Sequence, residues 1–348
     1  MTASRQIAIV GAGMAAITCA RTLVQAGHRV MVFEKSHTVG GRMATRNSAF
    51  GTFDTGAQYF TVRDPRFVQA LQTTPNVCKA WSANTVQVLD AHGRVAAAGL
   101  PAREPHWVPV PGMNTLIRRW AQPLADADGL ELNTRVMQIE PDALNRAHWQ
   151  LRTVGDGDST HVYGGFDAVV LAVPSVQAQE LLQTTPKGAP LLKKISAVTV
   201  APCWTLMLAY PQAMQPSFST LGPQWNAARS THHRISWLAR EGSKPRRDHI
   251  ERWTVQASPA WSTQHLNDDP QRITAKLCKA FSEGIHAEPS YAVAHRWLYA
   301  QTQTPLGQSF IRAADSGLGA CGDWCLGHRV EDAFISGLEL AQAVLAGR

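Results

Sequence analysis

Residues 6–36 read "QIAIVGAGMAAITCARTLVQAGHRVMVFEKS", and this stretch decides the fold of the chain. Its continuous apolar run Ile7–Val10 is typical of a parallel strand that is buried on both faces. A glycine turn follows and leads into apolar residues at helical spacing, and Gly27 is placed to end that helix. A second apolar run, Val30–Phe33, ends at Glu34. The stretch therefore predicts a strand–turn–helix–strand unit.

The turn in this unit has the pattern G-x-G-x-x-A. Gly11 permits the tight turn, Gly13 lets a pyrophosphate approach the backbone, and Ala16 keeps helix and strand close. The amides at the helix N-terminus favour phosphate, and Glu34 is placed to accept hydrogen bonds from ribose hydroxyls. A glycine turn without a ligand is the alternative. The residues predicted to bind a dinucleotide here are Gly11, Ala12, Gly13, Met14, Ala15, Ala16, Glu34 and Lys35.

Two further glycine segments follow the unit. In "VGGRMATR" (39–46), two glycines let the backbone fold back over a dinucleotide, and Arg42 has a rigid multi-donor fork that suits phosphate. A surface ion pair is the alternative role for Arg42. In "FDTGAQYFTVRDPRF" (53–67), the narrow Gly56–Ala57 backbone suits close approach by a flat ring, towards which Gln58 offers polar atoms.

Composition indicates a globular protein with a basic surface. The 348 residues are 45% apolar and 17% charged, with a formal net charge of +7. A basic field attracts anionic small molecules or nucleic acid, but the one basic stretch, "SKPRRDH" (243–249), reads as a solvated loop without a nucleic-acid-binding module. The chain shows no signal peptide and no run long enough to cross a bilayer. Its six scattered cysteines favour a reducing, cytoplasmic location.

Near the end of the chain stands "CGDWCLGHRVEDAFISG" (321–337). Cys321 and Cys325 have neither the spacing of a redox pair nor a second ligand pair for zinc, so we expect packing roles. Asp323 follows an expected strand at the carboxyl end of the sheet, where α/β proteins bind ligands. Capping of the next turn is its alternative role. A helix is expected from about Val330, with its positive end available to a negatively charged ligand.

Seven segments occur in an order that resembles the bacterial renalases, a group within the flavin family of amine oxidases and protoporphyrinogen oxidases. The resemblance runs from near Ile7 to the C-terminus. At one position the chain departs from it, because Glu241 stands where these renalases usually have Asn, which puts substrate preference in doubt. The segments are "GAGMAAITCARTL", "GGRMATR", "DTGAQYFTVRDPRF", "PGMNTLIR", "WLAREGSKPRRD", "AHRWLYA" and "CGDWCLGHRVEDAFISG".

The resemblance implies an α/β fold with a Rossmann-type FAD-binding domain, of the glutathione-reductase-2/amine-oxidase type, and a second, α+β substrate domain. The FAD-binding domain is expected to be discontinuous, with residues 1–76, 106–174 and 297–348. The substrate domain is expected over residues 77–105 and 175–296. Beyond the first turn, the resemblance implies these cofactor-binding residues: Arg42, Met43, Gly56, Ala57, Gln58, Val136, Asp323 and Val330.

The implied activity is oxidation of 2- or 6-dihydro-NAD(P) isomers to NAD(P)+ with a noncovalent FAD, and oxygen is reduced to hydrogen peroxide. Hydride loss from a dihydropyridine creates an aromatic ring and needs no general base, and no acid–base pair stands out in the sequence. We therefore assign no catalytic side chain and no metal. For the aromatic candidates and for His295, a structural role is the alternative. The implied substrate-binding residues are Gln58, Tyr59, Phe60, Thr61, Trp204, Trp237, His295 and Trp297.

Two other functions remain open at this point. One is a flavin-dependent amine oxidase or a related desaturase, and the other is a noncatalytic flavin-binding protein. The expected partners are a dihydronicotinamide dinucleotide and molecular oxygen, with no nucleic acid and no membrane. The sequence does not distinguish the 2- from the 6-dihydro isomer, NAD from NADP, or one oligomeric state from another.

Overall fold

The structure is a computed structural model that describes residues 4–81, 86–90, 92, 94–97, 104–214, 226–282 and 288–347. Its contacts divide the chain into two compact units. The first unit comprises Met1–Gly41, Ile117–Val200 and Thr302–Arg348, and the second comprises Arg42–Leu116 and Ala201–Gln301. Both units are discontinuous in sequence. The contacts group residues 42–76, 106–116 and 297–301 with the second unit, whereas the sequence-based division assigned them to the cofactor domain. They group residues 175–200 with the first unit, whereas that division assigned them to the substrate domain, and the functional division stays a prediction.

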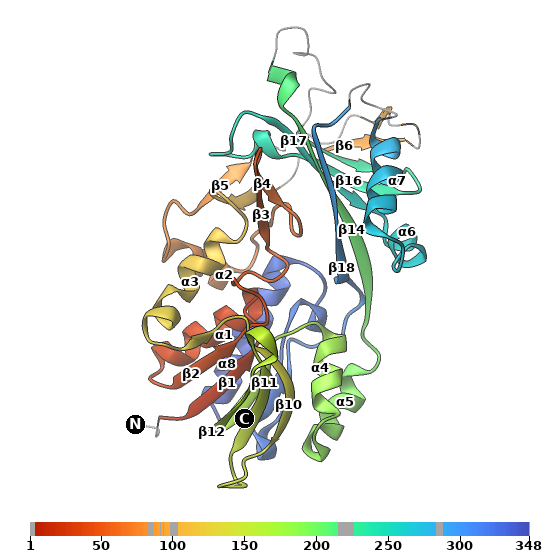
Figure 1. Cartoon of the computed structure of the whole chain (residues 1–348). Coiled ribbons are helices and arrows are strands. Elements are labelled where there is room, and N and C mark those ends of the chain that lie inside the picture. The colour runs from red at the N-terminus through yellow and green to blue at the C-terminus, as the bar shows by residue number, and fades with distance from the viewer. Residues whose placement is uncertain are drawn as a thin grey trace. The chain divides into compact units, whose positions relative to one another are not determined.

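A six-stranded sheet forms the centre of the first unit (Figure 1). Its strands, in spatial order, are β19 (Ile311–Ala313), β20 (Leu318–Ala320), β13 (Ala168–Leu171), β1 (Gln6–Val10), β2 (Arg29–Phe33) and β9 (Leu130–Glu131). All neighbours pair in parallel except β19, which runs antiparallel to β20 at the edge. Residues 7–9 of β1 are fully buried, which confirms the interpretation of its apolar run as a strand covered on both faces.

Helices and a small second sheet cover the central sheet of the first unit. The helices are α1 (Met14–Gln25), most of α3 (Thr115–Asp126), α4 (Ser175–Leu182), α5 (Ala189–Ile195) and α8 (Val330–Leu345). An antiparallel sheet is formed by β10 (Arg135–Pro141), β11 (Trp149–Val154) and β12 (Thr160–Phe166). Helix α8 lies directly against α1, because a Cβ on Gly337 would be 2.1 Å from the carbonyl oxygen of Ala15. The absence of a side chain at Gly337 permits this close approach.

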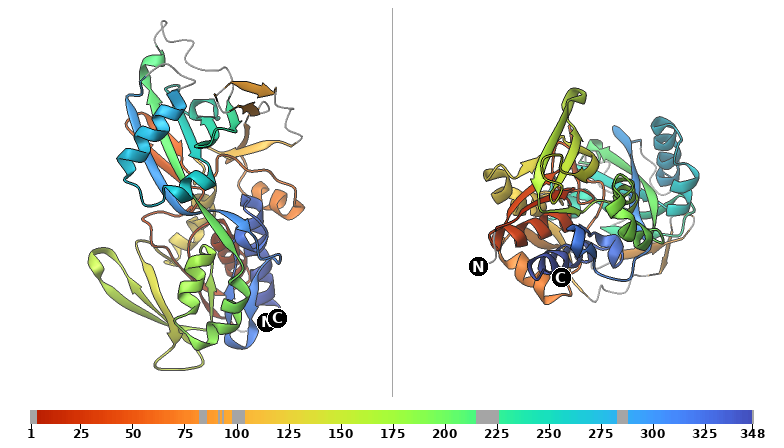
Figure 2. Two further views of the ribbon diagram at one scale, coloured as in Figure 1. Left: turned by 90° about the vertical axis from the view of Figure 1, so that its right-hand side faces the viewer. Right: turned by 90° about the horizontal axis from the view of Figure 1, so that it is seen from below.

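The second unit contains a mostly antiparallel seven-stranded sheet (Figure 2). Its strands, in spatial order, are β18 (Tyr291–Thr304), β14 (Thr199–Tyr210), β17 (Glu251–Ala257), β16 (Ile235–Arg240), β15 (Ala227–Ser230), β6 (Val86–Leu89) and β7 (Val95–Ala97). Helices α6 (Pro259–Gln264) and α7 (Pro270–Ser282) contribute apolar residues to the same core. Smaller elements complete the unit: hairpin β3 (Thr45–Ser48) with β4 (Gly51–Asp54), the pair β5 (Cys78–Trp81) and β8 (His106–Pro109), and α2 (Pro65–Gln72).

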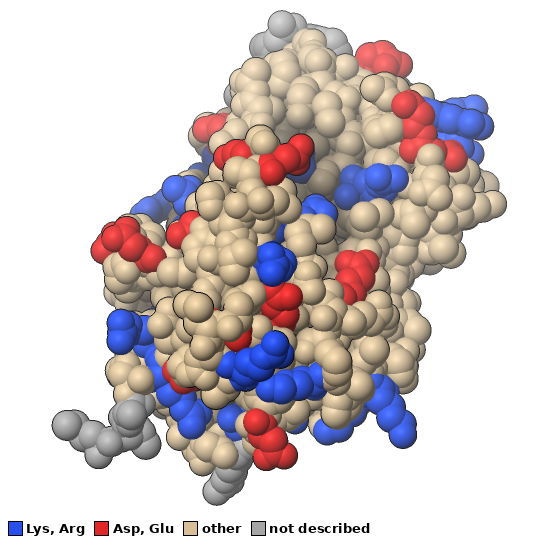
Figure 3. All heavy atoms as spheres, turned by 60° about the horizontal axis from the view of Figure 1, so that its bottom comes forward, with Lys and Arg blue, Asp and Glu red and all other residues tan. Residues whose placement is uncertain are grey.

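These elements confirm the predicted fold class, a Rossmann-like domain with an α+β substrate domain. Tryptophans supply much of the second unit's core, where Trp204, Trp253 and Trp261 are all buried. On the face shown in Figure 3, basic and acidic side chains are interspersed. Within the described ranges, every helix is too short or too polar to cross a bilayer.

Candidate functional site

The turn after β1 is built from two glycines with different constraints. Gly11 has a φ of +102°, and a Cβ there would lie 2.6 Å from the carbonyl oxygen of Ala172. Gly13 has an ordinary φ of −84° and caps α1, and a Cβ on it would meet no atom within 4 Å. Gly11 is therefore required by the fold. The open space at Gly13 lies where the sequence predicted a pyrophosphate.

The N-terminus of α1 offers donors that the protein does not use. The first helical bond is donated by the Ile17 amide to the Gly13 carbonyl oxygen, at 3.0 Å. The first turn contains no acidic residue, and no side chain caps it. In the described part of the chain, the amides of Met14, Ala15 and Ala16 have no protein acceptor. Free amides at the positive end of a helix are suited to a phosphate group.

Glu34 closes the turn from the end of β2. One carboxylate oxygen accepts the Ala12 amide and the other accepts the Ser36 amide, each at 2.9 Å. A carboxylate offers about four acceptor positions, so two remain for ribose hydroxyls. Glu34 is buried, whereas the neighbouring Lys35 is exposed. The carboxylate therefore shapes the turn and also retains the capacity that the predicted ribose contact requires.

The second glycine pair lies against the first turn. The Gly40 amide donates to the carbonyl oxygen of Ala12 at 2.9 Å. Gly41 has a φ of +54°, and a Cβ on it would lie 3.2 Å from the Cα of Gly13. The backbone thus folds back over residues 12 and 13. Together with the free amides and the spare acceptors of Glu34, these residues fit the diphosphate and ribose of a dinucleotide.

The segment from Asp323 to α8 differs in part from its predicted form. Asp323 is buried in a short 3₁₀ turn, Asp323–Cys325, just after β20, and α8 begins at Val330 as expected. The helix end is not bare, because the Asp332 carboxylate accepts the amide of Arg329 at 2.9 Å. Glu331 adds a second negative charge to the same turn. The positive potential at this end is therefore smaller than a bare helix terminus would provide.

Val136 and the cysteines of the first unit are packing residues in this structure. Val136 lies in β10 and belongs to a core cluster of the first unit, and its predicted contact with the cofactor stays a prediction. Cys321 and Cys325 are fully buried free thiols. Burial raises the pKa of Cys325 to about 12, which disfavours a reactive thiolate. Across the described residues, no group of three or more His, Cys, Asp or Glu side chains is arranged to hold a metal.

In the second unit, the loop of residues 54–58 is pinned against the segment that follows the second glycine pair. A Cβ on Gly56 would lie 2.0 Å from the Arg42 carbonyl oxygen, which also accepts the Ala57 amide at 2.9 Å. Met43 is buried beside it. The Arg42 guanidinium donates to the carbonyl oxygen of Ala300 at 3.4 Å. The narrow backbone predicted at Gly56–Ala57 thus has a defined partner within this unit.

Gln58 is buried and uses both ends of its carboxamide inside the protein. Its Nε2 donates to the carbonyl oxygens of Asp54 and Gly56, the latter at 3.1 Å. Its Oε1 accepts from the Lys244 ammonium at 3.2 Å. The side chain therefore stabilises its own loop. Its predicted contacts with cofactor and substrate stay predictions.

Four charged side chains form a buried group that we call the charge cluster: Asp54, Glu241, Lys244 and Arg247. Lys244 is 3.0 Å from Asp54, and both side chains are fully buried. Arg247 donates to the same Asp54 oxygen at 2.6 Å. The interpretation of residues 243–249 as a solvated loop was therefore wrong for Lys244 and Arg247. Their carboxylate partner Asp54 is 190 or more positions away, which no local charge pattern reveals.

Two aromatic groups hold four of the eight predicted substrate residues. In one, the Tyr59 ring lies 4.0 Å from His106 and 5.7 Å from Trp237, measured between centroids. Trp237 Nε1 and His106 Nδ1 are buried and lack hydrogen-bond partners among the described residues. Burial lowers the pKa of His106, so this ring is neutral near pH 7. The sequence did not single out His106, which lies on β8, distant in sequence from Tyr59.

In the other group, His295 and Trp297 on β18 meet edge to face at 4.8 Å. The Trp297 indole donates to the Thr55 carbonyl oxygen at 2.9 Å, which ties it to the loop of residues 54–58. An Arg46 nitrogen lies 3.0 Å from His295 Nδ1. The same nitrogen lies 3.5 Å from Nε2, and because a guanidinium only donates, the imidazole ring is the acceptor in this contact. Burial, with Arg46 nearby, lowers the pKa of His295 to about 4.

The other predicted substrate residues have packing roles or partial exposure. Trp204 is 1% exposed in the sheet core and donates to the His265 carbonyl oxygen at 3.0 Å. Phe60 is buried with its ring 5.5 Å from Phe67. Thr61 is partly exposed. The apolar contacts of Trp204 and Phe60 account for both side chains without a ligand.

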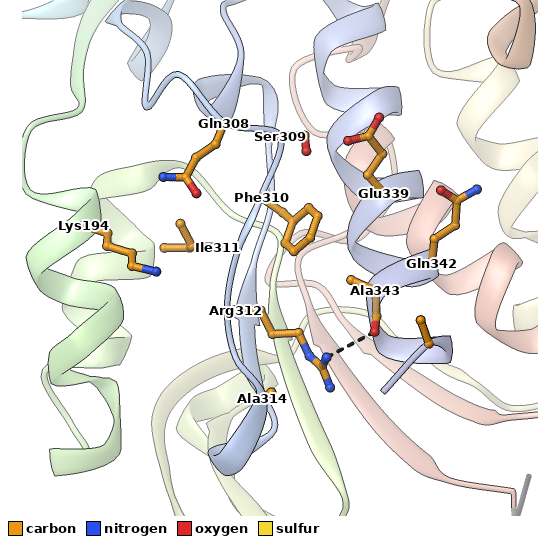
Figure 4. Close-up of a pocket in the computed structure, with 11 residues that line it drawn as sticks. Lys194, Gln308, Ser309, Phe310, Ile311, Arg312, Ala314, Glu339, Gln342 and Ala343 are labelled. Carbon is orange, nitrogen blue, oxygen red and sulfur yellow. Dashed lines mark hydrogen bonds between the residues drawn. The ribbon is translucent and has the colours of Figure 1, made fainter. Parts of the chain in front are cut away.

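A groove of about 660 Å³ lies in the first unit between α5, β19 and α8 (Figure 4). Lys194 comes from α5, Phe310 and Arg312 from the segment that forms β19, and Glu339 from α8. The Arg312 guanidinium donates to the carbonyl oxygen of Ala343 at 3.1 Å, along one wall. None of the predicted cofactor or substrate residues lines this groove.

Fold and site together define a Rossmann-like dinucleotide-binding protein with an attached substrate domain. A model described as "NAD(P)-binding Rossmann-like domain" matches residues 9–73. A second, described as "Flavin containing amine oxidoreductase", matches residues 98–345, well over half of the chain. The chain therefore belongs to the flavin-containing amine oxidoreductase family.

Individual relatives are similar to this chain either at low sequence identity over nearly the whole length or at higher identity over a short segment. Cyclohexylamine oxidase from Brevibacterium oxydans IH-35A superposes with a TM-score of 0.69 at 13% identity, with 99% of each chain covered. A 4,4'-diapophytoene desaturase of Staphylococcus haemolyticus is 43% identical over 58 residues, which are 17% of this chain and 12% of that protein. An L-amino-acid oxidase of Siganus canaliculatus is 46% identical over 56 residues, 16% of this chain and 11% of that protein. The curated relatives are matched over only 9% to 36% of their own lengths.

Proposed function

We propose that this flavin-dependent oxidoreductase binds FAD noncovalently and oxidises 2- or 6-dihydro-NAD(P) isomers, as the bacterial renalases do. The balanced reaction converts the dihydronicotinamide, oxygen and one proton into NAD(P)+ and hydrogen peroxide. When bound, the flavin supplies the two-electron acceptor. The protein's own tasks are to bind the dinucleotide and to orient the nicotinamide ring, and no general base is needed at the reacting carbon.

The residues of each unit are suited to one of these tasks. In the first unit, the α1 amides and Glu34 offer donors for phosphate and acceptors for ribose. In the second unit, Tyr59, Trp237 and Trp297 offer ring faces for a planar nicotinamide. Arg46 adds a positive charge, which favours the phosphates of a dinucleotide substrate.

The observation that best supports the proposal is that His295 is uncharged near neutral pH. Its Nδ1 faces the Arg46 guanidinium, and burial lowers its pKa to about 4, so the ring is a poor base near pH 7. The carboxylates Asp54 and Glu241 are paired with Lys244 and Arg247 in the charge cluster and do not offer a counter-charge to an ammonium. Hydride loss from a dihydronicotinamide needs neither a base nor an acidic recognition group.

Amine oxidation is the second candidate, because the matching family model and the L-amino-acid oxidase relative favour it. An ammonium substrate must lose a proton before oxidation, which requires a base or high pH. Anaerobic mixing of the purified flavoprotein with dihydronicotinamide isomers, primary amines and L-amino acids separates the two. Rapid bleaching by an amine alone would replace the proposal with amine oxidation. Bleaching by none of them would favour a noncatalytic flavin-binding protein.

We expect the purified protein to be yellow and to release its flavin on acid precipitation. Burial raises the pKa of Cys19, Cys78 and Cys325 to about 12, so these thiols are disfavoured as attachment nucleophiles. Chromatography of the supernatant should identify FAD rather than FMN, since the α1 turn is suited to a diphosphate. Flavin that stays in the protein pellet would contradict noncovalent binding.

We also expect the rate constant of flavin reduction by a dihydronicotinamide to be nearly flat between roughly pH 6 and 9. With a pKa near 4, His295 stays neutral throughout this window. Stopped-flow reduction without oxygen isolates the step, and His295→Gln is the matched variant. The variant should bind substrate more weakly and keep the flat profile. A sigmoid in the native protein that vanishes in His295→Gln would instead give His295 an acid–base role.

A further inference from the structure

Lys244 uses all three of its ammonium protons on three different side chains of the second unit. Nζ donates to Asp54 Oδ2 at 3.0 Å, to Glu241 Oε1 at 3.1 Å and to Gln58 Oε1 at 3.2 Å. Its side chain is fully buried. An ammonium has three donors and no acceptor, so this arrangement satisfies it completely and fixes its position.

The charge cluster is electrically balanced. Two carboxylates, Asp54 and Glu241, face two cations, Lys244 and Arg247, and all four side chains are at most 1% exposed. Glu241 also accepts the Asp54 amide at 3.2 Å and the Thr254 hydroxyl at 2.6 Å. Removal of any one charge would leave another unpaired in a dry interior, which is unfavourable.

Gln58 is a neutral hydrogen-bond partner of Lys244 and connects the charge cluster to carbonyl oxygens of the loop. With Oε1 held by Lys244, the Gln58 amide group must direct Nε2 at the carbonyl oxygens of Asp54 and Gly56. Those bonds turn two peptide planes of the loop towards the Gln58 side chain. On its other side the loop is held by amides donated from Thr55 and Ala57 to the carbonyl oxygens of residues 44 and 42, at 3.1 and 2.9 Å.

We propose that Lys244 and Glu241 are positioning residues for the flavin reaction, which act through the Gln58 carboxamide to hold the peptide planes of residues 54–57. The inference rests on the proposed function, because this loop is where the flat cofactor ring is expected to approach. Neither side chain takes part in the chemistry. Lys244 sets the orientation of Gln58, and Glu241 supplies a carboxylate that pairs with the Lys244 side chain at 3.1 Å.

The decisive variant is the double substitution Glu241→Gln/Lys244→Met. It removes one positive and one negative charge, keeps side-chain volume and leaves the Asp54–Arg247 pair intact, so the unit should fold. Gln58→Met removes the carboxamide and leaves all four charges in place. In the holoenzyme, both variants should slow anaerobic flavin reduction by a dihydronicotinamide about 10- to 100-fold, the effect of a small misplacement. Both should also shift the flavin absorption maximum.

The triple variant, which combines all three substitutions, tests whether the effect passes through Gln58. If it does, flavin reduction in the triple variant should be no slower than in Gln58→Met alone, because Gln58→Met already removes the carboxamide that links Lys244 to the loop. Multiplied effects would show that the cluster acts by another route and would overturn the proposal. So would native absorption and native reduction rates in Glu241→Gln/Lys244→Met, which would make the cluster purely structural.

Hydrogen exchange of the loop amides gives a readout independent of turnover. Protection of the Thr55 and Ala57 amides should fall in both the double variant and Gln58→Met. The matched control is Glu251→Gln, which breaks a mostly buried 3.0 Å pair with Arg240 in the same sheet. In the described part of the chain, Glu251 makes no hydrogen bond or ion pair with the loop. This control variant should lower stability and leave loop exchange and flavin absorption unchanged. A protein that holds no flavin would refute the proposed function, whereas unchanged loop exchange in the two variants would refute this inference alone.

Discussion

Replacing Asp54 with asparagine should cost about 3–5 kcal/mol of unfolding free energy, because it leaves two buried cations facing one carboxylate. Asp54 accepts from Lys244 and Arg247 and from the Met113 amide at 3.0 Å, and its side chain is fully buried. Asparagine has the same shape, but it directs donor hydrogens at groups that only donate. Urea unfolding of the native protein and of Asp54→Asn measures the difference.

The matched control removes the charge of a carboxylate that pairs with an arginine at the surface. For this control the partner must be exposed as well, which rules out Asp248, because its partner Arg252 is fully buried. Glu104→Gln is used instead, because Glu104 pairs with Arg63 and the two side chains are 31% and 59% exposed. Solvent screens such a pair, so the substitution should cost less than about 1 kcal/mol. Equal losses in the two variants would show that the charge cluster contributes no more than a surface ion pair.

The loss in Asp54→Asn should also depend on pH in a defined direction. Burial acts to raise the pKa of Asp54, but Lys244, Arg247 and the Met113 amide outweigh it and hold that pKa below the usual 3.8. The stabilisation by the carboxylate is therefore fully present above the unfolded-state pKa. It disappears as the pH falls through the lower, folded-state value. Native and variant stabilities should differ by a constant amount near neutrality. The difference should begin to shrink below about pH 4 and should vanish below the folded-state pKa.

The first unit was predictable because its signals are local. A strand of residues 7–10, a positive-φ glycine and a helix with free amides succeed one another within a few positions, and each follows from backbone sterics or apolar spacing. The glycine pair at residues 40 and 41 also predicted a backbone that folds back, and Gly41 lies close to Gly13 in the structure. Sequence patterns are most informative where a residue acts through its immediate neighbours.

The second unit was less predictable because its site depends on distant partners. Lys244 looks like part of a charged surface loop until the fold brings Asp54 to it from 190 positions away. His106 reaches Tyr59 only through the pairing of β5 with β8 and the bridge between Phe60 and Trp107. Trp204 and Trp237 look alike in sequence and are both buried. Only the hydrogen bonds of the folded chain distinguish them, because the Trp204 indole has an acceptor and the Trp237 indole has none among the described residues.

Gly13→Asp should weaken FAD binding by about 2–3 kcal/mol, roughly 30- to 150-fold, and leave the apoprotein as stable as the native one. A Cβ at this position meets no protein atom, so the fold accepts a side chain. Gly13 is also the N-cap of α1, where aspartate is favoured over glycine by a few tenths of a kcal/mol. The new carboxylate would accept the first-turn amides and repel the diphosphate that we expect there.

Gly13→Asn separates charge from size in this experiment. It fills the same space and caps the helix equally well, but it carries no negative charge. Fluorescence titration of each apoprotein with FAD should therefore give an affinity for Gly13→Asn between those of the native protein and Gly13→Asp, while thermal unfolding of the three apoproteins stays alike. Equal losses in both variants would assign the effect to steric exclusion alone. Native affinity in Gly13→Asp would place the diphosphate away from the α1 terminus and overturn the assignment of this turn.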